Sequence, residues 1–222
     1  MPPAARPTPP ELLVWDLDGT LVDSGHHVPQ AFVRTVAAVG GHVVSPADVE
    51  AAYPLGPPER MLAHLLRRPA TEEDLSAYYT HLGATGVVAY PGVPGVLRAQ
   101  RAYGPVAVCT GASRRAAAVL LHDAGLADLV DVLVCAEDAR RAKPAPDGLL
   151  VVAARLGVPP GALAMVGDSA RDLMAAGNAG ALAVAAGWGH EYDPAVPADV
   201  TIRSPAAALA LLGPAATTGR TG

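Results

Sequence analysis

Short apolar runs that end abruptly in polar or glycine residues limit the fold of this chain more than any other feature. Helical patterns follow several of these runs, so candidate strands and candidate helices alternate along the sequence. That alternation is typical of an α/β fold built on a parallel sheet. The predicted strands lie at 12–15, 106–109, 132–135, 163–166 and 182–185.

Residues 29–89 break the alternation. Ser45 is a typical N-cap, and Pro46 then occupies the first helical position. Thr71 starts a second helix in the same way, with acidic residues in its first turn. Between them, 57–68 carries apolar residues at helical spacing. The sequence therefore predicts a small all-helical insertion after the first strand.

The chain length sets the domain organisation. A chain of 222 residues fits one large domain that carries a smaller insertion. The ends are rich in proline, alanine or glycine and have no apolar periodicity, so we expect them to be disordered. The predicted parts are a core at 11–28 and 90–212, the insertion at 29–89, and tails at 1–10 and 213–222.

Charge and composition argue against several classes of function. The net charge of -5 at pH 7 disfavours nucleic-acid binding, which needs a basic surface. No apolar run approaches the roughly 20 residues of a membrane-spanning helix. The N-terminus lacks an apolar signal-peptide core, and the two cysteines do not make a disulfide framework. We therefore expect a cytoplasmic protein that acts on a small molecule, either as a monomer or as a homodimer.

Two carboxylates follow the first predicted strand. Side chains alternate along an extended segment, so Asp16 and Asp18 project the same way. They lie at the carboxyl end of a parallel strand, where open α/β sheets bind ligands. Two such carboxylates repel each other unless a cation lies between them. Gly19 lets the chain turn sharply after them. This pattern predicts a cation site.

Further polar residues follow the later strands. Asp168 and Asp172 follow the fourth strand at a spacing that places both on one face of a helix. Mg²⁺ prefers oxygen ligands of this kind and keeps several waters. Thr110 and Gly111 supply a hydroxyl and a backbone N–H at a helix start, which suits an anion. Lys143 lies in a stiff, proline-bounded turn and adds a fixed positive charge.

Taken in order, these residues resemble a known superfamily. The motifs are Asp16-x-Asp18-Gly-Thr, Thr110, Lys143-Pro and Gly-Asp168-x-x-x-Asp172. Together they resemble the haloacid dehalogenase-like hydrolases, and within them the phosphoglycolate phosphatase-like branch. The resemblance covers nearly all of 12–212. It implies a Rossmann-like α/β core with a helical cap, and a Mg²⁺-dependent phosphatase that acts on a small phosphorylated metabolite.

The resemblance also implies roles for the acidic residues. Asp16 would attack phosphorus and form an aspartyl-phosphate. Asp18 would protonate the leaving oxygen and then deprotonate the water that hydrolyses the intermediate. Mg²⁺ would be held by Asp16, the backbone carbonyl of Asp18, and Asp168. Dehalogenases lack the second acid because a halide needs no proton, so Asp18 favours phosphate esters.

The remaining roles are phosphate binding, support and substrate contact. The expected phosphate-binding residues are Thr110, Gly111 and Lys143. Asp172 would orient the metal shell or the lysine, and Thr20 and Ser169 would support the site. His26, His27 and Arg60 lie in or near the cap, where they are candidates for contacts with the substrate.

Three other interpretations remain open. A phosphosugar mutase resembling β-phosphoglucomutase has the same core and cap, but it needs a histidine where this chain has Val28. A module that binds a phospholigand without turnover would keep the same fold. Cys109 and Arg115 also match the Cys-x5-Arg signature of cysteine phosphatases, although Val108 stands where that family has His or Asp.

Overall fold

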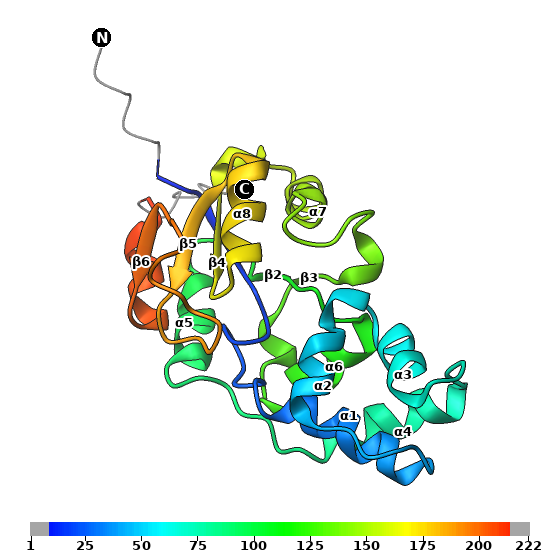
Figure 1. The fold of residues 1–222 in the computed structure, drawn as a ribbon. Helices are drawn as coiled ribbons and strands as arrows, with labels where there is room; N and C mark the ends of the chain where they lie inside the picture. The colour runs from blue at the N-terminus through cyan, green and yellow to red at the C-terminus, as the bar shows by residue number, and fades with distance from the viewer. Residues whose placement is uncertain (1–8, 214–222) are drawn as a thin grey trace.

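A parallel β-sheet forms the centre of the molecule. The computed structural model describes residues 9–213, and within that range the sheet has six strands in the order β3-β2-β1-β4-β5-β6 (Figure 1). Every neighbouring pair is parallel. This confirms the predicted α/β fold. The strands are β1 (Leu12–Trp15), β2 (Ala107–Cys109), β3 (Val132–Val134), β4 (Leu163–Gly167), β5 (Leu182–Ala186) and β6 (Val200–Ile202).

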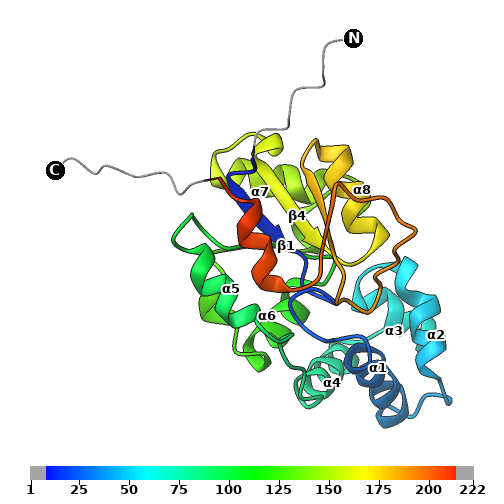
Figure 2. The ribbon, with the colours of Figure 1, turned by 90° about the vertical axis from the view of Figure 1, so that its left-hand side faces the viewer.

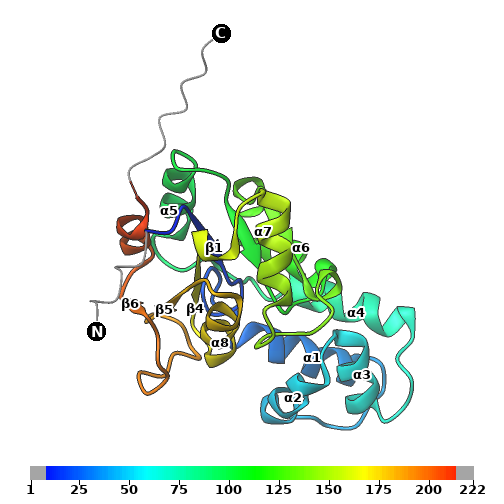
Figure 3. The same cartoon turned by 90° about the horizontal axis from the view of Figure 1, so that it is seen from above.

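The helices form two groups. Helices α1 to α4 lie between β1 and β2 in sequence and gather to one side of the strands (Figures 1 and 3). They are α1 (His27–Ala38), α2 (Pro46–Ala52), α3 (Pro58–Leu66) and α4 (Glu72–Gly83). The others are α5 (Val93–Gln100), α6 (Arg114–Asp123), α7 (Asp147–Leu156) and α8 (Ala170–Ala179). Short 3₁₀ turns span Tyr53–Leu55, Ala127–Leu129, Ala136–Asp138, Pro160–Ala162 and Pro205–Leu211.

Both faces of the sheet are buried at its centre, which explains why β1 is apolar at every position. Leu13 and Trp15 of β1 pack into one cluster with residues of α5 and α6. Leu12 and Val14 point to the opposite face and pack with residues of α7 and α8. Figure 2 shows β1 and β4 running between these helices. Because side chains alternate along each strand, successive residues of β1 point to opposite faces of the sheet, and both faces are covered by helices.

The helix starts predicted from Ser45 and Thr71 are confirmed. The Ser45 side chain accepts a hydrogen bond from the Asp48 backbone N–H (3.2 Å), and Thr71 accepts one from Asp74 in the same way (3.2 Å). Each aspartate bonds back to the backbone N–H of its cap residue, so both helices begin with a complete capping box. The predicted apolar positions of α3 are buried: Met61, Leu62, Leu65 and Leu66.

The chain leaves the core and returns to it at one place. The Asp23 backbone N–H donates to the Val88 carbonyl (3.0 Å), and Tyr90 N–H donates to the Leu21 carbonyl (3.0 Å). Between these bonds, Val22 and Ala89 form an antiparallel bridge. The segments before α1 and after α4 are therefore joined side by side beneath the helices.

The structure differs from the sequence prediction mainly at the edges. Strand β6 was not predicted, and it takes its register from β5 through Ala186, which pairs with Ile202. Strand β3 ends one residue early because Cys135 N–H bonds to the Asp138 carboxylate (2.8 Å) in a 3₁₀ turn. The predicted tails lie almost wholly outside the described residues. None of the helices in 9–213 is long and apolar enough to span a membrane.

Candidate active site

The carboxyl ends of β1 and β4 bring three acidic side chains together. Asp16 follows β1, and its backbone N–H bonds to the carbonyl of Val166 in β4 (2.9 Å). Asp168 follows β4 directly, and Asp172 lies in the first turn of α8. One carboxylate oxygen from each lies within 4.8 Å of the others, and all three residues are buried. The parallel pairing of β1 and β4 therefore produces the convergence that the strand-end positions predict.

Lys143 bridges two of these carboxylates. Its ammonium nitrogen lies 2.5 Å from Asp16 Oδ1 and 2.5 Å from Asp172 Oδ1. The lysine reaches them from the loop between β3 and α7. Burial lowers the pKa of Lys143, but the Asp16 and Asp172 carboxylates raise it further, so its pKa lies above the ordinary value and the group stays charged.

Asp172 is held from two sides. Its second oxygen, Oδ2, accepts hydrogen bonds from the Ser169 hydroxyl (2.6 Å) and the Ser169 backbone N–H (3.1 Å), which completes the capping box of α8. A Cβ on Gly167 would overlap the Asp172 side chain, so glycine leaves room for it. These contacts fit the supporting roles predicted for Asp172 and Ser169, because they fix the carboxylate that faces Lys143.

Asp168 lies in a tight cradle. Its carboxylate accepts hydrogen bonds from the Thr20 hydroxyl (3.2 Å) and from the Glu191 backbone N–H (2.9 Å). Gly19, with φ +78°, and Gly189 pass so close that a Cβ on either would overlap the carboxylate. Burial raises the pKa of Asp168 to about 6. The site therefore holds this carboxylate where burial disfavours its ionised form.

The acidic cluster fits a hard divalent cation. Burial, together with the nearby Asp172 carboxylate, also raises the pKa of Asp16 well above its ordinary value. Lys143 is bonded to two of the three carboxylates, those of Asp16 and Asp172, so negative charge is in excess within the cluster. Carboxylate oxygens within reach of one another are the donors that Mg²⁺ prefers. A cation there would offset both the burial and the repulsion from Asp172 that raise the pKa values of Asp16 and Asp168.

Asp18 is held by a residue that the sequence did not indicate. The Ser24 hydroxyl donates a hydrogen bond to Asp18 Oδ1 (2.7 Å), and both residues line the same cavity. Burial raises the pKa of Asp18, while the bond from Ser24 partly lowers it. A carboxyl whose pKa is raised holds its proton to higher pH, which suits an acid/base group.

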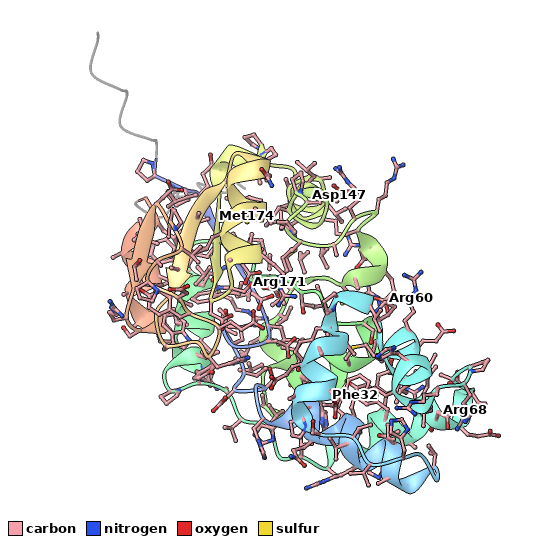
Figure 4. All side chains as sticks on the ribbon, in the orientation of Figure 1. Phe32, Arg60, Arg68, Asp147, Arg171 and Met174 are labelled. Carbon is pink, nitrogen blue, oxygen red and sulfur yellow. The ribbon has the colours of Figure 1, made fainter. Side chains whose placement is uncertain are left out.

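A cavity of about 230 Å³ lies between the sheet edge and the helical segment. Thr110 and Gly111 lie in it, and the Thr110 hydroxyl accepts a hydrogen bond from the Ala112 backbone N–H (3.0 Å). Neither His26 nor His27 lines this cavity. The same is true of Arg60, which is exposed and projects to the outside of the helical segment (Figure 4).

The loop after β5 contributes residues for which sequence analysis predicts no role. Trp188 donates from its indole N–H to the Thr20 carbonyl (3.0 Å), which ties this loop to the one after β1. His190 and Glu191 line the cavity. The only signal in the sequence was the glycine pattern around Trp188, which does not reveal that this loop lies against Asp168.

The structure does not support a cysteine nucleophile. Cys109 is buried on the sheet face that packs against α7 and α8, and burial raises its thiol pKa to about 11. Arg115 lies over the ring of Tyr79 at 4.2 Å and pairs with Glu72 (3.3 Å). Neither Cys109 nor Arg115 lines the cavity, so the Cys-x5-Arg spacing does not form a phosphate site here.

Comparisons with known proteins agree with this geometry. A family model described as haloacid dehalogenase-like hydrolase matches residues 10–180. The phosphoglycolate phosphatase of Chromobacterium violaceum is 34% identical over 218 residues, which cover 86% of this chain and 91% of that protein. The phosphoglycolate phosphatase of Escherichia coli strain K12 is 30% identical over 211 residues, with 83% and 84% covered.

Solved structures share the fold. CbbY from Rhodobacter sphaeroides, in complex with phosphate, superposes with a TM-score of 0.76 at 24% identity, covering 91% of this chain and 99% of that one. A hydrolase from Deinococcus radiodurans, solved with bound phosphate and sodium, gives a TM-score of 0.63 at 28% identity, with 93% and 99% covered.

Proposed function

Since the chain belongs to the haloacid dehalogenase-like hydrolases and is a phosphatase, we propose that it hydrolyses a small phosphomonoester through an aspartyl-phosphate on Asp16, with Mg²⁺ as cofactor. The observation that carries this proposal is the convergence of Asp16, Asp168 and Asp172 with Lys143 at one cavity. The names of the relatives make phosphoglycolate one candidate substrate, and sugar phosphates are another. We place the enzyme in the cytoplasm.

In the first step a carboxylate oxygen of Asp16 attacks phosphorus, and the bond between phosphorus and the alcohol oxygen breaks. Asp18 gives its proton to the departing oxygen, so the alcohol leaves neutral. In the second step Asp18 takes a proton from a water molecule that attacks the aspartyl-phosphate. Inorganic phosphate leaves and Asp16 is restored.

The other residues stabilise charge on the phosphoryl group. Thr110, Gly111 and Lys143 would bind its non-bridging oxygens, and such preorganised donors usually make the largest contribution in these sites. Asp16, Asp168 and the backbone carbonyl of Asp18 would hold Mg²⁺. The cation supplies positive charge to the phosphoryl oxygens when it is bound.

The helical segment 29–89 would act as a cap over the reaction. It provides one side of the cavity, and the sheet edge provides the other. Closing such a cavity excludes water until the alcohol has left. Val28 lines the cavity at the position where the mutase resemblance needs a histidine. Since valine cannot move a proton, this observation favours hydrolysis over phosphoryl transfer between sugars.

The direct test uses p-nitrophenyl phosphate, a generic aryl ester. Purified protein should release p-nitrophenol in the presence of Mg²⁺ and stop when a chelator is added. Asp16→Asn should abolish turnover and leave the circular dichroism spectrum unchanged. Asp128→Asn is the matched control, because Asp128 is exposed in the 3₁₀ turn Ala127–Leu129 and does not line the cavity, and its activity should be that of the wild type. Normal turnover by Asp16→Asn would exclude the proposed nucleophile, and an inactive wild type would favour a module that only binds a phospholigand.

The acid role of Asp18 needs a separate test. Asp18→Asn should slow esters of poorly acidic alcohols most, because their leaving oxygens need a proton. Aryl esters with acidic leaving groups should be affected less. A Brønsted plot of kcat against the pKa of the leaving group checks this. Equal losses across the series would contradict the assignment.

A further inference from the structure

The wall of the cavity that faces Asp16 is apolar. Val28 contributes to it, and the helical segment adds Phe32, Tyr53, Gly56, Pro58, Met61 and Tyr78. Within the described residues, no lysine, arginine or histidine of this segment lines the cavity. From the core, Ala116 and Leu120 of α6 extend the same apolar surface. A substrate bound at Asp16 therefore presents its alcohol part to aliphatic and aromatic groups.

This wall is firmly packed. The rings of Phe32 and Tyr78 lie with their centroids 4.3 Å apart, which joins α1 to α4. Phe32, Tyr78 and Met61 are each at most 4% exposed. Close aromatic contacts and this degree of burial fix the side chains in place. The wall is therefore a preformed surface that favours one kind of occupant.

Two tyrosine hydroxyls interrupt it, those of Tyr53 and Tyr78, and Tyr78 is the more deeply buried of the two. Tyr78 is 2% exposed, and within residues 9–213 its hydroxyl has no hydrogen-bond partner. No fully buried side-chain nitrogen or oxygen in that range lacks a partner, so this hydroxyl opens onto the cavity that Tyr78 lines. Leaving such a group without a partner costs free energy that a ligand oxygen would recover. Its neighbour Tyr79 is already paired with the Ser113 hydroxyl (3.1 Å).

The basic side chains that line the cavity are Lys143, Arg171 and His190, and all three lie on the core side. Lys143 is bonded to two aspartates, and Arg171 pairs with Glu191 (3.0 Å). Figure 4 shows Arg171 at the end of α8 that faces the helical segment. The acids that line the cavity are Asp16, Asp18, Asp168, Asp172 and Glu191. A second anionic group that packed against the helical segment would therefore meet an apolar wall, and burying an unpaired charge is strongly unfavourable.

We propose that the substrate is a phosphate ester of a compact, uncharged alcohol whose carbon surface packs on Phe32 and Met61 and whose hydroxyl or carbonyl oxygen hydrogen-bonds to Tyr78. This inference rests on the proposed function, since it describes the leaving group of that reaction. It distinguishes this chain from the activity that its relatives are named for. Phosphoglycolate carries a carboxylate, for which the helical segment offers no cation.

Three esters of nearly equal size test the proposal. They are 2-hydroxyethyl phosphate, which has a neutral hydroxyl, propyl phosphate, which has none, and phosphoglycolate, which has a carboxylate. We expect kcat/KM to fall in that order, with phosphoglycolate at least about tenfold below 2-hydroxyethyl phosphate, since one unpaired buried group is worth at least that factor. A preference for phosphoglycolate would overturn the proposal.

The Tyr78 contact is tested by removing one oxygen atom. Tyr78→Phe should lower kcat/KM for 2-hydroxyethyl phosphate about 2- to 10-fold and leave propyl phosphate unchanged. Tyr79→Phe is the matched control, because its hydroxyl is bonded to Ser113 and the residue does not line the cavity. It should leave the ratio between the two esters unchanged. An equal ratio in Tyr78→Phe and wild type would contradict the proposed hydrogen bond.

A gain of function gives the reverse test. Met61→Lys places an ammonium group in the apolar wall and should raise kcat/KM for phosphoglycolate relative to propyl phosphate. Hydrolysis of p-nitrophenyl phosphate separates the possible failures. If the wild type hydrolyses that ester but prefers phosphoglycolate, only the substrate class is wrong. If it hydrolyses none of these esters with Mg²⁺, the proposed function itself is wrong.

Discussion

A methyl group at position 19 would press directly on the carboxylate of Asp168. Gly19 has φ +78°, and a Cβ built there would overlap the carboxylate atoms of that residue. Gly157, which ends α7, has a similar φ of +70°, but a Cβ there would meet no atom within 4 Å. The two glycines therefore share the same backbone demand and differ only in what lies beside them.

The structure gives a magnitude for each substitution. Alanine in the left-handed region costs about 1–2 kcal/mol, so both Gly19→Ala and Gly157→Ala should lose that much stability. For a chain of this size each kcal/mol lowers Tm by about 2–4 °C. Only Gly19→Ala must also displace Asp168 from its bonds with Thr20 and Glu191. Disturbing the partners of a metal ligand typically costs about 10- to 100-fold in metal affinity or activity.

The assay combines thermal unfolding with a Mg²⁺ titration of p-nitrophenyl phosphate hydrolysis. We expect similar Tm losses in the two variants, or a larger one in Gly19→Ala. The Mg²⁺ concentration for half-maximal rate should rise about 10- to 100-fold in Gly19→Ala alone. If Gly157→Ala raises it equally, the effect comes from general destabilisation. An unchanged Mg²⁺ dependence in Gly19→Ala would refute the reasoning that this glycine makes room for Asp168.

Three further substitutions and treatments have defined outcomes. Burial raises the pKa of Asp18, and the hydrogen bond from Ser24 partly lowers it. Ser24→Ala should therefore raise that pKa and move the pH profile of kcat to higher pH. An unchanged profile would show that Ser24 does not tune the acid/base group. The Arg68 guanidinium holds the pKa of Asp74 below its ordinary 3.8. The pair therefore adds to the free energy of unfolding above pH 3.8, and this contribution is lost as the pH falls through the pKa of Asp74 in the folded protein. Urea unfolding should therefore show Asp74→Asn less stable than wild type at neutral pH, with a gap that narrows in acid. Cys109, with its thiol pKa raised to about 11, should resist iodoacetamide at neutral pH until the protein is unfolded, whereas rapid alkylation of the native protein would reopen the cysteine mechanism.

The sequence predicted the elements whose local signal and tertiary role agree. Asp16 and Asp168 were recognisable because each follows an apolar run, and parallel strands must end at one edge. Ser45 and Thr71 were recognisable as caps because capping depends only on nearby residues. At these positions the spacing of residues along the chain is enough to predict the local geometry.

Other features depend on contacts distant in sequence. Strand β6 is three residues long and carries little signal of its own, so only its pairing with β5 defines it. Glu191 reaches Asp168 through a backbone N–H, which any residue type could supply. The position of Arg60 relative to the cavity depends on how α3 is rotated against α1 and α4, and Tyr78 enters the cavity for the same reason. Helix rotation of this kind is not encoded in a local motif.

The short antiparallel pairing of 21–23 with 88–90 joins the two ends of the helical segment and attaches it to the core at one place. The core should tolerate replacement of the helical segment, because a longer loop adds little to the free energy cost of bringing its two ends together. The strand order and register of the sheet would be unchanged by a shorter or longer helical segment. The proposed bond-breaking residues and most of the apolar wall therefore lie in separate stretches of sequence, so substitutions can change one set while the other stays constant.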